Sequence, residues 1–137
     1  MKQMNISEAA KLMGVTAVTL RYYERVGLIP PVTRKNGGVR DFQQEDLNWI
    51  EFIKCMRSSG LSVESLIEYT TLYQQGDATL EERKRLLQEE RNQLVAKYEE
   101  IGATIQRLNG KIEDYENGKF QEAEKRLPDW TTKEAMS

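Results

Sequence analysis

Histidine is absent from this chain of 137 residues, and cysteine occurs once, at Cys55. A single cysteine cannot form a disulfide within the chain. Without histidine, neither a Cys/His metal cage nor a Ser-His-Asp or Cys-His catalytic set can be built. Carboxylate pairs occur at 89–90 and 99–100, but on an exposed helix they are solvated charges. We therefore expect a protein that is not an enzyme and that holds no metal and no cofactor.

Long hydrophobic runs are also missing. No stretch reaches the roughly 18 apolar residues of a membrane span, and no basic-then-apolar leader is present, so we expect a cytoplasmic protein with no membrane partner. Apolar residues make up 39% of the chain and charged residues 31%, and the mean hydropathy is -0.68, so the surface is large relative to the core. The length allows one small domain, or a small domain with one extended element.

The charges are unevenly distributed along the chain. Residues 1–60 contain nine Lys/Arg and six Asp/Glu, a net charge of +3, whereas the remaining 77 residues contain 11 and 16, a net charge of -5. A basic N-terminal part on an acidic remainder is typical of a protein whose one end meets a polyanion such as DNA. Chance asymmetry in an ordinary protein is the alternative at this magnitude.

Two short helices are predicted near the N-terminus. Ser7 is the predicted N-cap of the first, and Gly14 supplies the turn that ends it. Thr16 is the predicted N-cap of the second, which runs to Val26 and stops at Gly27. Two short helices joined by a tight turn favour a DNA-binding helix-turn-helix, with a plain helical hairpin as the alternative.

Residues 34–42 predict a small hairpin, because two glycines lie between residues that can be extended. Such a hairpin beside a helix-turn-helix is called a wing. A third helix is predicted over residues 43–59, and a fourth begins at the N-cap Ser62 and ends near residue 75. The apolar residues that converge on one side of the third helix are Trp49, Phe52, Ile53 and Met56.

A long uninterrupted helix is predicted from residue 79 to about 116. Its apolar residues alternate in steps of four and three, which is the heptad pattern of a coiled coil. At 1.5 Å per residue such a helix is about 57 Å long, so its apolar seam needs a second chain as cover and a homodimer is expected. The d positions are Leu87, Leu94, Ile101, Leu108 and Tyr115, and the a positions are Arg91, Tyr98, Ile105 and Ile112.

The alternative is a helix covered by its own C-terminal tail. Residues 119–137 offer only three large apolar side chains for that purpose, Phe120, Leu127 and Trp130, which is too few. We therefore predict an all-α fold with a small β wing. Its domains are a winged helix-turn-helix head over 1–77, a coiled-coil dimerisation helix over 78–117 and a short charged tail over 118–137.

Several segments resemble the MerR family of transcription regulators. The run Leu-Arg-Tyr-Tyr-Glu at 20–24, followed by Gly-Leu-Ile at 27–29, is the most specific of them, and residues 6–10 and 14–16 precede it. The resemblance continues through the hairpin at 37–42, the third helix at 46–56 and Gly-Leu-Ser at 60–62. It implies a homodimer held by an antiparallel coiled coil, which binds a near-palindromic promoter site and distorts it so that RNA polymerase can engage.

The resemblance also implies which residues contact double-stranded DNA. Arg21, Tyr22 and Arg40 match positions that grip the phosphate backbone, to which guanidinium and phenol groups can donate. The start of the second helix is the part expected to approach base edges, through Thr16, Ala17 and Val18. Arg25, Arg34 and Lys35 complete the expected DNA-binding set, whereas Leu20, Tyr23 and Phe42 are expected in the core.

For the effector, the segment around Cys55 resembles the NmlR/AdhR branch of the family, whose members respond to reactive aldehydes and related electrophiles. Cys55 lies at the edge of the predicted core face, and Lys54 and Arg57 would favour its reactive thiolate. Its place near the C-terminal end of a helix disfavours an anion. The alternatives are that Cys55 only packs, with a non-covalent ligand or no effector at all, or that the chain is a coiled-coil adaptor for another protein.

Overall fold

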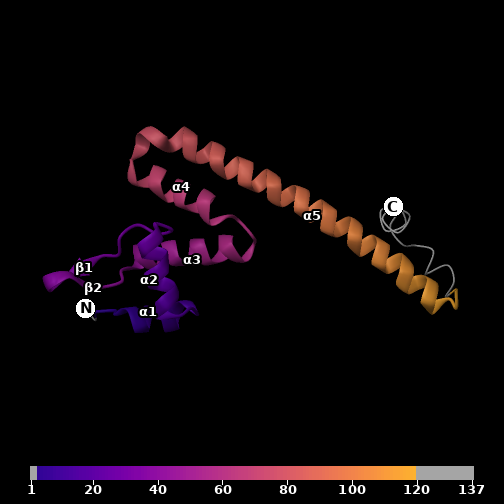
Figure 1. Ribbon diagram of the computed structural model, residues 1–137, viewed down its shortest axis with the longest axis horizontal. Helices are drawn as coiled ribbons and strands as arrows, with labels where there is room; N and C mark the ends of the chain where they lie inside the picture. The colour runs from indigo at the N-terminus through magenta and orange to yellow at the C-terminus, as the bar shows by residue number, and fades with distance from the viewer. Residues whose placement is uncertain (1–2, 120–137) are drawn as a thin grey trace, which may run out of the picture. The chain divides into compact units, whose positions relative to one another are not determined.

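The computed structural model describes residues 3–119. Within that range the chain forms five α-helices and one two-stranded antiparallel sheet, as predicted for an all-α fold with a small wing (Figure 1). Two short 3-10 turns, η1 and η2, join neighbouring elements. The elements are α1 (Ile6–Met13), α2 (Ala17–Val26), β1 (Arg34–Lys35), η1 (Asn36–Gly38), β2 (Val39–Arg40), α3 (Gln44–Ser58), α4 (Val63–Gln74), η2 (Asp77–Thr79) and α5 (Leu80–Glu116).

Local capping chemistry defines both helices of the helix-turn-helix. The N-cap of α1 is Asn5 and not Ser7: the Asn5 side chain accepts a hydrogen bond from the Glu8 backbone N–H, and the Glu8 carboxylate accepts one from the Asn5 N–H. This reciprocal pair is a capping box, which places Ser7 inside the first turn. Gly14 ends α1 with a φ of 70°, and Thr16 caps α2 as predicted.

The wing is a short hairpin. Arg34 lies opposite Arg40 and Lys35 opposite Val39 in the antiparallel register. The η1 turn between the strands needs left-handed backbone at Gly37 and Gly38, whose φ values are 76° and 93°. Only glycine adopts such φ values without strain, so these two residues explain why the hairpin forms here.

The head has a core to which all of its helices and the segment after α2 contribute. The residue pairs in contact include α1 with α2 and α1 with α3, and Thr70 of α4 donates a hydrogen bond of 2.7 Å to the carbonyl oxygen of Leu28. These contacts join α1, α2, α3 and α4 into one packed body. The fully or largely buried apolar residues are Ala9, Ala10, Leu20, Tyr23, Leu28, Ile29, Val32, Phe42, Leu47, Ile50, Ile53, Leu61 and Leu66.

The buried face of α3 includes Ile53, as predicted, but otherwise differs from the predicted one. Leu47, Ile50 and Ile53 are buried, whereas Trp49 and Phe52 are only partly covered. The stripe at steps of three meets the head core, and the large rings turn toward α4, where Trp49 lies 4.9 Å from the ring centre of Tyr73. Periodicity alone does not tell which of two apolar stripes is buried.

The turn between α4 and α5 is fixed by hydrogen bonds. The Thr79 hydroxyl donates to the carbonyl oxygens of Leu72 and Gly76, at 2.6 and 2.8 Å. Arg83 donates in turn to the Thr79 hydroxyl and to the Gly76 carbonyl oxygen, and its guanidinium lies 5.4 Å from the ring centre of Tyr73. The head forms a unit that extends to Arg91 and so includes the start of α5, beyond the boundary predicted at residue 77.

From Asn92 onward α5 belongs to a second unit, which within the described residues is a single helix. Most of its apolar side chains are exposed: Tyr98 is 78% exposed and Ile101 60% exposed, and Ile105, Leu108 and Ile112 are also exposed, whereas Leu94 is half-buried. The helices within residues 3–119 include none long and apolar enough to cross a membrane.

Candidate nucleic-acid interface

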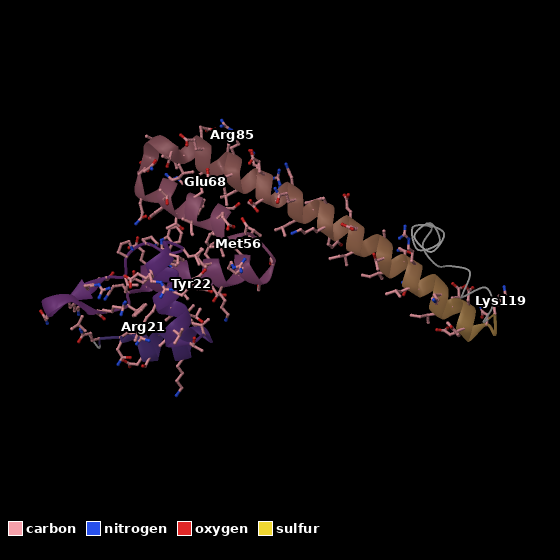
Figure 2. All side chains as sticks on the ribbon, in the orientation of Figure 1. Arg21, Tyr22, Met56, Glu68, Arg85 and Lys119 are labelled. Carbon is pink, nitrogen blue, oxygen red and sulfur yellow. The ribbon has the colours of Figure 1, made fainter. Side chains whose placement is uncertain are left out.

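The exposed face of α2 holds the residues predicted to contact DNA. Val18 is 72% exposed and Arg21, Tyr22 and Arg25 are exposed as well, whereas Leu20 and Tyr23 on the opposite face are buried. Figure 2 labels Arg21 and Tyr22 on this helix. The face therefore offers an apolar residue near the start of the helix and a phenol and two guanidinium groups after it, which suits a duplex groove flanked by phosphates.

Two local contacts orient side chains on this face. The Thr16 hydroxyl accepts a hydrogen bond from the Thr19 backbone N–H at 3.1 Å and lies 2.9 Å from the Thr19 hydroxyl, so Thr16 fixes the start of α2. The Arg25 guanidinium lies over the Tyr22 ring, 5.6 Å from its centre. A cation held on an aromatic face keeps the phenol and the guanidinium together at the surface.

The wing is tied to α2 by Glu24. Its carboxylate accepts hydrogen bonds from the Val32 backbone N–H at 2.7 Å, from Arg40 Nε at 2.9 Å and from Arg34 Nη2 at 3.4 Å. Burial raises the pKa of Glu24, but the Val32 N–H and the two guanidinium groups outweigh it and leave the pKa below its ordinary value. Glu24 is therefore a carboxylate between two cations predicted to bind DNA.

A second carboxylate, Asp41, lies at the base of the wing. It accepts hydrogen bonds from the Met4 backbone N–H and from Gln43 Nε2, and Lys35 Nζ lies 2.8 Å away. The Lys35 ammonium, followed by the Met4 N–H, holds the pKa of Asp41 below its ordinary range although the residue is buried. Asp41 joins the N-terminal segment, the wing and the start of α3.

Neither Glu24 nor Asp41 is among the functional residues predicted from the sequence. They are the two acidic residues in the stretch 9–44, which contains six Lys/Arg. An isolated acidic residue in a basic segment indicates an ion pair within the segment, because most of the charged side chains near it are cations.

Cys55 is exposed on α3, but the two cations expected to assist it point elsewhere. Lys54 Nζ donates to the Met13 carbonyl oxygen at 2.8 Å, and Arg57 Nη1 donates to the Leu61 carbonyl oxygen at 2.7 Å. Both cations are thus engaged with backbone carbonyl oxygens, and their assistance to a Cys55 thiolate stays a prediction. Lys54 instead connects α3 to the end of α1, next to the turn that leads into α2.

Two hollows near α4 are smaller than the pockets that bind drug-sized ligands. One, of about 170 Å³, is lined by Asn48, Trp49, Phe52 and Tyr69. Another, of about 180 Å³, lies between α4 and the start of α5, from which Glu68 and Arg85 are labelled in Figure 2. Pockets that bind drug-sized ligands have volumes of about 300 Å³ or more. Within residues 3–119 no three His, Cys, Asp or Glu side chains gather so as to hold a metal ion.

Comparison with known families gives two matches that together span the head and most of α5. Residues 4–72 match the MerR HTH family regulatory protein model, and residues 47–111 match a model described as MerR, DNA binding. Among curated proteins, the HTH-type transcriptional regulator AdhR of Bacillus subtilis is 64% identical over 92 residues, which are 67% of this chain and 66% of AdhR. An uncharacterized HTH-type regulator of Haemophilus influenzae is 30% identical over 113 residues, 82% of this chain and 84% of that protein.

Solved structures give the same result. A MerR family transcriptional regulator from Listeria monocytogenes is 43% identical, with a TM-score of 0.81 over 96% of this chain and 98% of that one. HiNmlR, described as a MerR family regulator lacking the sensor domain and bound to promoter DNA, is 29% identical, with a TM-score of 0.75 over 86% of this chain and 94% of that one.

Proposed function

Because this chain belongs to the MerR family of DNA-binding transcriptional regulators, we propose that it acts as a homodimer on a near-palindromic promoter site. We further propose that it activates transcription by RNA polymerase through distortion of that DNA when a reactive aldehyde or related electrophile modifies Cys55. The DNA-binding part of the proposal is supported by the hydrogen bond that Arg40 donates to the Glu24 carboxylate. This bond joins the exposed face of α2 and the wing into one basic surface.

The homodimer is supported by the second unit of the chain. Ile101, Ile105, Leu108 and Ile112 are each more than half exposed along one heptad seam of α5. Burying such a seam against a second copy removes the apolar surface from water. Two heads on one dimer would present two α2 helices, which is what a site with two half-sites requires.

DNA binding by this surface can be tested with Arg40→Ala. A phosphate contact carries little base information, so we expect weaker binding to the chain's own promoter duplex and to an unrelated duplex by similar factors. The slope of affinity against salt concentration should fall by about one unit. Selective loss of promoter binding alone would make Arg40 a base-reading residue. Parent-like affinity of Arg40→Ala for both duplexes would show that the wing does not contact DNA through Arg40.

The sensing part of the proposal rests on the position of Cys55. The thiol is exposed, and its neighbour Lys54 is hydrogen-bonded to Met13 at the end of α1. An adduct at Cys55 would change how α3 meets its surroundings, and the Lys54 bond offers a path to the turn before α2. Such a change shifts transcription only if the adduct favours one of two states of the dimer.

The test is Cys55→Ser, which keeps the size of the side chain and removes the nucleophile. We expect the variant to fold, dimerise and bind promoter DNA like the parent, and to give no increase in transcription in vitro when an aldehyde is added. Intact-mass spectrometry of the parent should show one adduct per chain under the same conditions. Ser59→Ala, at an exposed position just after α3, is the control and should respond fully. A full aldehyde response by Cys55→Ser would reduce Cys55 to a packing residue.

A further inference from the structure

We propose that Glu24, although negatively charged, strengthens DNA binding, because it is a positioning residue for Arg40 in the wing. The inference rests on the wing's proposed contact with phosphate. It assigns to Glu24 a role opposite in sign to the one its charge alone predicts, since an acid beside a polyanion weakens binding.

Glu24 is placed to hold the wing. It lies on α2 with its side chain only 12% exposed, and both carboxylate oxygens are used. Oε2 accepts from the Val32 backbone N–H at 2.7 Å, in the segment between α2 and β1. Oε1 accepts from Arg40 on β2 at 2.9 Å and from Arg34 on β1 at 3.4 Å. One side chain of α2 thus reaches the connecting segment and both strands.

The hydrogen bond to Glu24 leaves the terminal Nη1 and Nη2 groups of Arg40 available for phosphate. Glu24 takes the Nε hydrogen, and within residues 3–119 the Nη1 and Nη2 groups of Arg40 make no hydrogen bond. The Arg40 side chain is 28% exposed, so part of it is in contact with solvent. Two parallel N–H groups in a fixed plane match the two oxygens of a phosphate, and a side chain already held in place loses less rotamer freedom on binding.

Arg34 depends less on Glu24. Its Nη1 donates to the Gly38 carbonyl oxygen at 2.8 Å within the wing, while its bond to Glu24 is the long one. The effect of Glu24 on DNA affinity should therefore pass mainly through Arg40, which makes it measurable by combining two substitutions.

The experiment measures affinity of the full chain for its own promoter duplex and for an unrelated duplex by fluorescence anisotropy. Glu24→Gln removes the charge, yet its amide oxygen can still accept from Val32. We expect affinity for both duplexes to fall about tenfold, the size of one charge-assisted hydrogen bond. Glu45→Gln removes the same charge from an exposed position at the start of α3 and should leave affinity unchanged or slightly higher.

The decisive measurement is the same Glu24→Gln change in an Arg40→Ala background. If Glu24 acts through Arg40, its loss there removes only an opposing charge, and affinity should stay level or rise by up to about threefold. Glu24→Asp keeps the charge but is one methylene shorter, so it should weaken binding as Glu24→Gln does. Circular dichroism melts check that each variant is folded. If Glu24→Gln is unfolded, Glu24→Asp takes its place as the test of whether Glu24 acts through Arg40.

Several results would overturn the inference. Higher affinity of Glu24→Gln for both duplexes would make Glu24 an opposing charge only. Equal losses with and without Arg40 would show that Glu24 does not act through it. Parent-like binding by Glu24→Asp would mean that charge and not reach matters. If Arg40→Ala leaves every duplex unaffected, the wing contact of the proposed function fails and this inference with it; if Arg40→Ala weakens binding and Glu24→Gln does not, only the inference fails.

Discussion

The head and the second unit of the chain use the same apolar residue types in opposite ways. In the head, Ile50, Ile53 and Leu66 are completely or almost completely buried within one chain. In α5 beyond Asn92, Ile101 and Ile105 are more than half exposed. The head therefore obtains its hydrophobic stabilisation from its own residues, whereas the exposed seam of α5 would obtain it from a second copy in the homodimer that we propose.

The two regions should consequently respond differently to protein concentration. Unfolding of a core within one chain does not depend on concentration, while an interface between copies is stabilised by mass action.

Charging the seam should separate the copies. In Ile105→Asp with Leu108→Asp, each dimer would bury four carboxylates, and we expect the dissociation constant to rise about a thousandfold or more. Sedimentation velocity should then show monomers with parent-like heads. The control is Ala103→Asp with Gln106→Asp, which adds the same charges outside the heptad seam and should stay dimeric. A dimer that survives the seam variant would disprove the coiled-coil assignment.

Truncating the head core should lower stability without changing assembly. Ile53 is fully buried, so Ile53→Ala is expected to reduce the free energy of unfolding by about 2–5 kcal/mol in urea titrations. Glu51→Ala, at an exposed position of the same helix, should change it by less than about 0.5 kcal/mol. Dissociation of the Ile53→Ala dimer under native conditions would show that the two regions are not independent.

The start of α1 offers a smaller and more local test. Asn5→Ala removes the side chain that caps the helix and should cost about 1 kcal/mol of unfolding free energy. Ser7→Ala changes an exposed residue inside the first turn, where alanine is the better helix former, and should be neutral or slightly stabilising. The reverse ranking in thermal melts would restore Ser7 as the cap.

The smallest effect concerns the pH dependence of the head. The pKa of Asp41 is lower in the folded chain, so its contribution to stability is present above its unfolded pKa of about 3.9 and is lost as pH falls through the folded value. The effect is small because its partner Lys35 is 46% exposed. Asp41→Asn should have a flatter decline of unfolding free energy below about pH 4 than the parent. An unchanged decline of unfolding free energy at low pH would mean that Asp41 does not contribute to the pH dependence of stability.

Local features of the structure could be predicted because the residues that determine them are neighbours in sequence. Thr16 and Ser62 cap the helices that follow them, Gly27 ends α2, and Gly37 with Gly38 makes the hairpin. The long helix and its apolar seam could be predicted because a heptad repeat places its apolar residues along one face of a helix, whatever surrounds that helix. The DNA-binding class of the chain was accessible for the same reason, since its most specific motif is one continuous run.

The tertiary structure decided the features that depend on distant residues. Whether Ile50 or Trp49 faces the core depends on where α1 and α4 lie. Lys54 meets Met13, 41 residues away, and Asp41 meets Met4, 37 residues away. Glu24 acquires its partners only once the wing folds back beside α2. A sequence records which groups can pair; folding selects the pairs, because each charged or apolar group takes the neighbour that removes most of its unfavourable exposure or isolation.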